Sequence, residues 1–99
     1  MIKRIVMMKL LPETEGHFID IFNQVKNEIR SQTGCEGLEL LRSSDKGGIC
    51  IWTISLWKSI DDLETYRSSA LFRKTWSEVK SLFADRAQAW TLTSIDYLP

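Results

Sequence analysis

The segment CEGLELLRSSDKGGICIW (residues 35–52) contains two apolar stretches separated by a short polar one. Residues 43–48, SSDKGG, favour a tight turn, so we expect strands at about 36–43 and 48–57 that pair as a hairpin. Cys50 then lies opposite roughly residue 42, which leaves Cys35 ~20 Å away at strand rise. A disulfide needs Cα atoms within about 7 Å. The hairpin therefore predicts two reduced thiols.

The residues before this hairpin predict a strand and a helix. The segment IKRIVMMKL (2–10) is apolar and partly alternating, as in a strand. Residues 13–34 follow Pro12, with acidic residues early and basic residues late, an order that suits the helix dipole. Gly34 is a natural helix stop. The apolar stripe of this helix consists of Phe18, Phe22, Val25 and Ile29.

The residues after the hairpin predict two more helices and a last strand. Ser59, with Asp62 three residues later, resembles a capping box for a short helix. A further helix begins around Ser69, and AWTLTSI (89–95) supplies the strand. The stripe of the longer helix consists of Phe72, Trp76, Val79 and Phe83.

This order, β-α-β-β-α-β, predicts one α+β domain over residues 1–99 with a ferredoxin-like layout. Short right-handed crossovers would wind it into a four-stranded antiparallel sheet with the helices on one face.

Composition argues against several classes of protein. The 13 basic and 13 acidic side chains balance, which gives no field that would attract nucleic acid or an anionic membrane. Charges interrupt the apolar N-terminus, and no apolar run is long enough to cross a membrane, so we expect a cytoplasmic protein. His17 is the only histidine, and with two separated cysteines it makes a poor metal set, so no metal site is expected.

Strand parity predicts two different sheet faces. Even-numbered positions are nearly all apolar in every strand and should face the helices. Odd-numbered positions mix polar and large apolar residues, too apolar for a freely solvated face. A second copy, sheet against sheet around a two-fold axis, is the simplest cover. The alternative is a monomer with an apolar exposed sheet. The predicted interface residues are Ile5, Met7, Leu41, Ile51 and Trp57.

Three segments resemble the antibiotic biosynthesis monooxygenase family of the dimeric α+β barrel superfamily. They are MIKRIV (1–6), IRSQTGCEGLELLR (29–42) and WKSIDDLETYRSSALFRKTW (57–76). The resemblance extends over almost the full chain and implies a homodimer that forms a dimeric α+β barrel. It also implies oxygenation of electron-rich aromatic or phenolic compounds by dioxygen without metal, flavin or nicotinamide. No cofactor is therefore expected, in line with the absence of a G-x-G-x-x-G or phosphate-binding loop.

Such chemistry needs a dry pocket for a small aromatic ligand, which the even sheet face and the helix stripes would build. The expected pocket residues are Met8, Phe22, Leu40, Trp52, Ile54, Tyr66, Phe72, Trp76 and Trp90. These aromatics could instead be packing alone. The related haem-degrading branch uses an asparagine, a tryptophan and an iron-ligating histidine at positions that align with Val6, Tyr66 and Trp76 here. The asparagine and the histidine are both missing, which disfavours haem degradation by that route.

Candidate catalytic residues are Tyr66, Trp76, His17 and Arg42. Tyr66 could donate its hydroxyl to a bound phenolate or lie in water at the rim. His17 titrates near neutrality, but the helical periodicity favours a solvated position beside Phe18. Arg42 could neutralise an oxyanion, although an ion pair with Asp61 or Asp62 is favoured.

We therefore expect a cofactor-independent monooxygenase that acts on a small electron-rich aromatic or quinol-type compound. The alternative is a non-catalytic dimer of the same fold that binds a small ligand or regulates.

Overall fold

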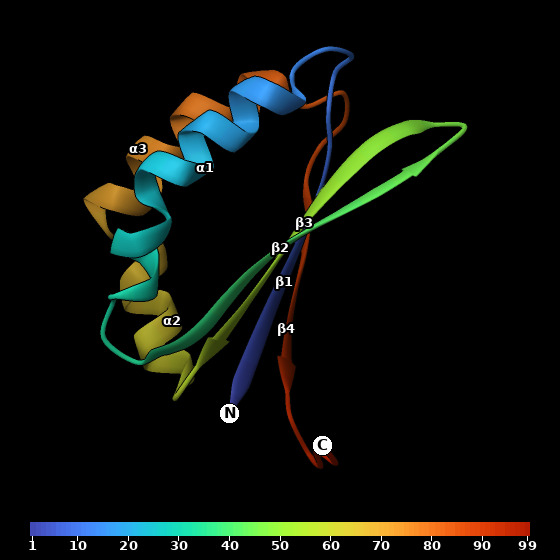
Figure 1. The fold of residues 1–99 in the computed structure, drawn as a ribbon. Helices are drawn as coiled ribbons and strands as arrows, with labels where there is room; N and C mark the ends of the chain where they lie inside the picture. Colours follow the sequence, from blue (N-terminus) through green and yellow to red (C-terminus); the bar gives the residue numbers. More distant parts are fainter.

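The computed structural model describes all residues 1–99 and has four strands in one antiparallel sheet. Its strands are β1 (Ile2–Lys9), β2 (Cys35–Asp45), β3 (Gly48–Trp57) and β4 (Gln88–Thr93). Its helices are α1 (Glu15–Arg30), α2 (Ile60–Arg67), α3 (Ala70–Val79) and the 3-10 turn η1 (Lys80–Leu82). The strand order is β2-β3-β1-β4, and all helices lie on one side of the sheet (Figure 1). The predicted ferredoxin-like α+β layout is confirmed.

Two serine caps divide the chain after β3 into two helices. The Ser59 side chain accepts a hydrogen bond from the Asp62 backbone N–H (3.1 Å), and Ser69 accepts one from the Phe72 N–H (3.1 Å). Each cap satisfies a backbone donor that the first helical turn leaves free. The predicted helix starts at Ser59 and Ser69 are thus confirmed.

The hairpin also forms where it was predicted. Asp45 pairs with Gly48, and the Asp45 carboxylate accepts a hydrogen bond from the Gly47 N–H (2.7 Å), which stabilises the turn. Ser43, one residue beyond the expected position, lies opposite Cys50. Both cysteines are free thiols, as predicted.

The register between strands corrects the predicted sheet faces. In an antiparallel pair, residues directly opposite each other project to the same face. Ile2 pairs with Trp57 and Met8 pairs with Ile51, so even positions of β1 share a face with odd positions of β3. The same reversal holds for β4, where Ile5 pairs with Trp90. Even numbering therefore marks the helix side in β1 and β2 only.

Five residues were placed on the wrong face for this reason. Trp52, Ile54 and Trp90, predicted to line the pocket, project from the face that no helix covers. Ile51 and Trp57, predicted to lie at the dimer interface, are buried beneath the helices with 1% and 0% of their surface exposed. The cause is the same for both groups, because the register between paired strands puts even positions of β1 on the same face as odd positions of β3 and β4.

The uncovered sheet face, called the open face below, is strongly apolar. Its β4 residues Trp90 and Leu92 are 41% and 47% exposed, and Leu41 on β2 is 41% exposed. Single exposed apolar residues are common, but a contiguous patch across four strands is not. The large apolar residues of the open face are Ile5, Met7, Leu41, Trp52, Ile54, Leu56, Trp90 and Leu92.

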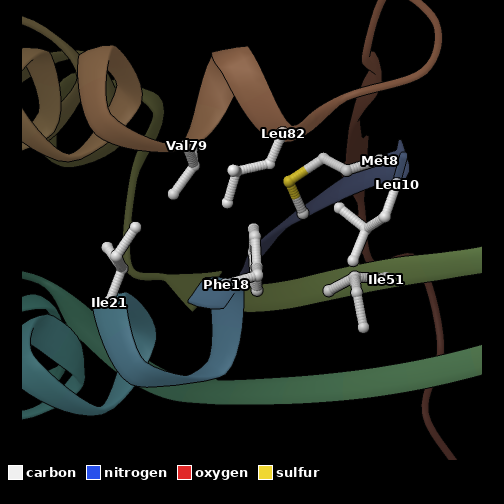
Figure 2. Close-up of a cluster of buried hydrophobic side chains, with 7 residues drawn as sticks. All are labelled: Met8, Leu10, Phe18, Ile21, Ile51, Val79 and Leu82. Atoms are coloured by element: carbon white, nitrogen blue, oxygen red, sulfur yellow. The ribbon is translucent and has the colours of Figure 1, made fainter. Parts of the chain in front are cut away.

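Beneath the helices lie two separate cores. The main core lies between the sheet, α1 and the end of α3 (Figure 2) and consists of Met8, Leu10, Phe18, Ile21, Ile51, Val79 and Leu82. The α2 core consists of Ile2, Cys35, Trp57 and Leu63, with Tyr66 packed against it. Between the two cores, β1 and β3 carry the pairs Arg4–Ser55 and Val6–Thr53. Polar side chains thus interrupt the apolar interior at its middle.

No helix of the structure is both long enough and apolar enough to cross a membrane.

Replacing Gly34 should destabilise the fold. Gly34 has a φ of +80°, and a Cβ added there would overlap the Asp62 carboxylate in the first turn of α2. We expect Gly34→Ala to lower the free energy of unfolding by at least about 1–2 kcal/mol in urea titrations, because an L residue is strained in this region. Gly16 is the matched control, since nothing lies within 4 Å of a Cβ added there. Gly16→Ala should be neutral or stabilising by up to ~1 kcal/mol, and equal loss in both variants would contradict the prediction.

Candidate functional site

A cavity of about 300 Å³ lies between the sheet and α1, α2 and α3, in the interval between the two cores. Its volume is at the lower end of the range for small-molecule sites. Most of its wall is apolar, with a few polar groups from β1, β3, α2 and α3. The lining residues are Arg4, Val6, Met8, Phe18, Ile21, Phe22, Val25, Ile29, Leu38, Thr53, Ser55, Leu63, Tyr66, Arg67, Phe72, Thr75, Trp76 and Val79.

A continuous series of aromatic rings runs along one side of this cavity. Trp57 stacks on Tyr66 (centroids 5.1 Å apart), and Tyr66 meets Phe72 edge-on (5.3 Å). Phe72 in turn stacks on Trp76 (6.0 Å), which meets Phe83 edge-on (5.5 Å). These are the favoured aromatic geometries. The middle three rings pack on one another and also line the cavity, whereas Trp57 serves packing alone.

Of the polar residues from the sheet, Arg4 and Ser55 lie nearer the α2 core than Thr53 does. Arg4 on β1 lies between Ser55 on β3 and Thr91 on β4. Its Nη1 donates a hydrogen bond to Thr91 Oγ1 (2.6 Å). Ser55 Oγ accepts one from Trp57 Nε1 (2.9 Å), which satisfies the buried indole.

Two polar atoms at the helical side of the cavity have no partner in the protein. Arg67 Nη1 pairs with the Glu64 carboxylate (3.0 Å), but Arg67 Nε is buried without a hydrogen bond. Thr75 Oγ1 on α3 is also buried and unpaired. A buried donor without a partner is destabilising by ~1–3 kcal/mol, so a ligand oxygen or a water would be favoured beside it.

The site shifts the pKa of two groups. Burial, reinforced by the negative charge of a Cys35 thiolate, raises the pKa of Tyr66 to about 12. The hydroxyl is therefore protonated at neutral pH and available as a donor. Burial and the nearby Arg67 guanidinium lower the pKa of Arg4, while Glu64 partly offsets them. Arg4 is nevertheless a cation at neutral pH.

The predicted pocket residues fall into two groups. Met8, Phe22, Tyr66, Phe72 and Trp76 line the cavity. Of the others, Leu40 packs against the main core, and Trp52, Ile54 and Trp90 lie on the open face. The Trp52 indole N–H donates to Ser43 Oγ (2.8 Å), away from the cavity.

The predicted catalytic residues are also divided. Tyr66 and Trp76 lie in the cavity, whereas His17 is exposed on α1 outside it. Arg42 is on the helix side, as its parity predicted, but its Nε pairs with Glu15 Oε2 (2.7 Å). The predicted pairing of Arg42 with Asp61 or Asp62 is wrong, because Arg42 on β2 lies beside Glu15 in the first turn of α1 and not beside the first turn of α2.

The polar residues of the cavity were not predicted from the sequence. These are Arg4, Thr53, Ser55, Arg67 and Thr75. Arg4 had a visible signal, since it is a charged residue between Ile2 and Val6 on the apolar side of β1. The other four had no comparable signal, because exposed polar residues of strands and helices look the same in sequence.

The positions aligned with the haem-degrading branch, Val6, Tyr66 and Trp76, all line this cavity. Nowhere in the chain do three or more His, Cys, Asp or Glu side chains gather as they would around a metal ion.

Ionisation of Tyr66 should make stability fall at high pH. An unfolded tyrosine has a pKa of about 10, so between about pH 10 and 12 the folded chain holds a proton that the unfolded chain loses. The contribution is complete below pH 10 and declines above it. Between pH 9 and 11 we expect a loss of roughly 1–1.5 kcal/mol in urea unfolding that Tyr66→Phe removes. Tyr97 in the C-terminal tail is 78% exposed, so Tyr97→Phe should leave the loss intact. Identical pH profiles for wild type and Tyr66→Phe would contradict this assignment.

Known structures share the architecture. A variant of SnoaB, a cofactor-independent oxygenase from Streptomyces nogalater, superposes with a TM-score of 0.84 at 17% identity over 99% of this chain and 96% of its own. A proposed antibiotic biosynthesis monooxygenase from Caulobacter crescentus gives 0.86 at 19% identity, over 96% of this chain and 90% of its own. A protein of Mycobacterium tuberculosis gives a TM-score of 0.82 at 17% identity, over 99% of this chain and 98% of its own. At these identities the likeness establishes the fold.

Among curated protein sequences none matches the chain. The model of one family, antibiotic biosynthesis monooxygenase, matches residues 1–77, which include β1 through most of α3 and every cavity-lining residue except Val79. The chain therefore belongs to the antibiotic biosynthesis monooxygenase family.

Proposed function

We propose that this protein is a cofactor-independent monooxygenase that acts on a small electron-rich aromatic or quinol-type compound. The observation that carries the proposal is the aromatic-lined cavity of about 300 Å³ with a protonated tyrosine and two arginines at one end. Membership of the family and the resemblance to a cofactor-independent oxygenase support it.

The chemistry assigns separate tasks to substrate and protein. Triplet oxygen reacts slowly with closed-shell molecules, so the substrate must lose a proton and then supply electrons itself. When a methylene carbon becomes a ketone, it gives up four electrons, one oxygen atom enters the product and the other leaves as water. The protein would stabilise the intermediate anion with Tyr66 and the arginines, and the aromatic walls would exclude water.

A second function is favoured by one feature of the lining. The cavity wall contains no aspartate, glutamate or histidine, and Tyr66 with a pKa of about 12 is a poor base at neutral pH. This composition suits a dimer that binds a small ligand, or regulates, without chemistry. Saturable quenching of tryptophan fluorescence by aromatic compounds that are recovered unchanged would favour this alternative.

We also propose that two copies associate through their open faces, with residues 1–99 as one domain in each subunit. A sheet-to-sheet contact around a two-fold axis needs a single self-complementary patch, and the open face is one. Burial of its apolar residues would supply the association energy. The two free cysteines support the predicted cytoplasmic location.

Oxygen consumption tests the enzymatic function. With anthrones and hydroquinones in metal-free buffer, an oxygen electrode should record uptake above the uncatalysed rate. Trp76→Ala and Tyr66→Phe should each lower that rate by about tenfold or more, because they remove a stacking surface and a donor to the anion. Tyr97→Phe, outside the cavity, should not change it. Absence of uptake with every compound would contradict the monooxygenase proposal.

Charge on the open face tests the dimer. Light scattering after gel filtration should give twice 11.5 kDa for the wild type and 11.5 kDa for Ile54→Glu or Trp90→Glu, since a carboxylate cannot be buried unpaired. Ile60, 46% exposed on α2, provides the matched control, and Ile60→Glu should remain dimeric. Circular dichroism should report folded variants. A monomeric wild type at micromolar concentration would refute the proposed association.

A further inference from the structure

The cavity holds an excess of positive charge. Arg4 and Arg67 both line it, each lies close enough to affect the other, and the lining contains no acidic residue. Glu64 is the one carboxylate that acts on this pair, and its two oxygens lie 3.0 and 3.3 Å from Arg67 Nη1. Arg4 has no ion-pair partner, and its side chain donates to the neutral Thr91 hydroxyl. Two guanidinium groups thus share one carboxylate.

The free N–H donors of Arg4 and Arg67 also favour an anionic ligand. A guanidinium offers five N–H donors in a planar fork that matches a carboxylate. One nitrogen of Arg4 and one of Arg67 are occupied, and Arg67 Nε is buried with no acceptor. A buried donor without a partner, such as Arg67 Nε, is unfavourable, and an anionic oxygen beside it would supply the missing acceptor and offset the positive charge of the two arginines.

The two ends of the cavity also differ in polarity. Arg4, Ser55, Tyr66 and Arg67 belong to the part next to the α2 core, whereas Phe22 and Val79 come from α1 and α3 next to the main core. A ligand that suits both parts is anionic at one end and apolar at the other.

We propose that the cavity selects aromatic carboxylates, with the carboxylate between Arg4 and Arg67 and the ring against Phe22, Trp76 and Val79. This names the substrate class of the site used in the proposed function, and it rests on that site. A carboxylate bridging two guanidiniums gains charge-assisted hydrogen bonds in a largely apolar enclosure.

Binding of an isosteric pair of compounds tests the proposal. 2-Naphthoate and 2-naphthamide have nearly the same shape and differ in charge, and both can be titrated by calorimetry and by tryptophan quenching. Wild-type protein should bind naphthoate about tenfold or more tighter than naphthamide. Arg4→Gln and Arg67→Gln should each remove most of this preference, so that the two compounds bind these variants with nearly equal affinity.

Matched variants separate the local charge from net charge and from misfolding. Arg73 is exposed on α3 and does not line the cavity, so Arg73→Gln should keep the full preference for naphthoate. Arg67→Lys retains the positive charge and should keep part of the preference for naphthoate. Equal affinity for the two compounds, equal effects of Arg73→Gln and Arg67→Gln, or binding of neither compound would overturn the proposal.

These measurements involve no turnover, so their result is separate from that of the oxygen assay. Selective naphthoate binding without oxygen uptake by any compound would refute the monooxygenase and leave the carboxylate site standing. Oxygen uptake with neutral quinols, together with equal affinity for naphthoate and naphthamide, would support the monooxygenase and refute the carboxylate site.

Discussion

The antiparallel register between β1 and β3 is the constraint on which the rest of the structure depends. It pairs Ile2 with Trp57 and Met8 with Ile51, and so builds one apolar layer for the helices from even positions of β1 and odd positions of β3. A slip of one residue would exchange every side chain of β3 between the two faces. Trp57 and Ile51 would then be exposed, and Trp52 and Ile54 would enter the interior.

The same register accounts for a cavity in so small a protein. Apolar rows of the sheet lie under α2 at one end and under α1 and the end of α3 at the other, and each row supports its own core. Between these two ends, β1 and β3 carry the pairs Arg4–Ser55 and Val6–Thr53. Their side chains cannot fill the interior as densely as leucine or phenylalanine would. The helices span this interval on the Tyr66–Phe72–Trp76 series, whose rings support one another without filling it. The hollow is therefore a product of polar residues at interior positions of two neighbouring strands.

The chemistry of the site follows from its low polarity. Burial raises the pKa of Tyr66 above its ordinary value, and partial burial leaves Arg4 with less solvent to screen the repulsion from Arg67. Each of these groups stabilises negative charge, and none of them is suited to remove a proton at neutral pH. Such a site is better adapted to hold an anion than to create one, which is why ligand binding and oxygen chemistry are distinct questions here.

Local sequence was enough to determine the elements and their order. Caps at Ser59 and Ser69, the turn at residues 45–48 and the apolar stripes of α1 and α3 are short-range features, because each depends on residues within a few positions of one another. They predicted the ferredoxin-like layout, the free cysteines and the aromatic contribution of Tyr66, Phe72 and Trp76. The identity of the sheet faces in β3 and β4 was decided by tertiary structure, since it depends on how these strands register against β1, which is adjacent to neither of them in the chain. Tertiary structure also decided that Arg4 of β1 and Arg67 of α2 lie in one cavity, because only the packing of the helices on the sheet brings these two residues together.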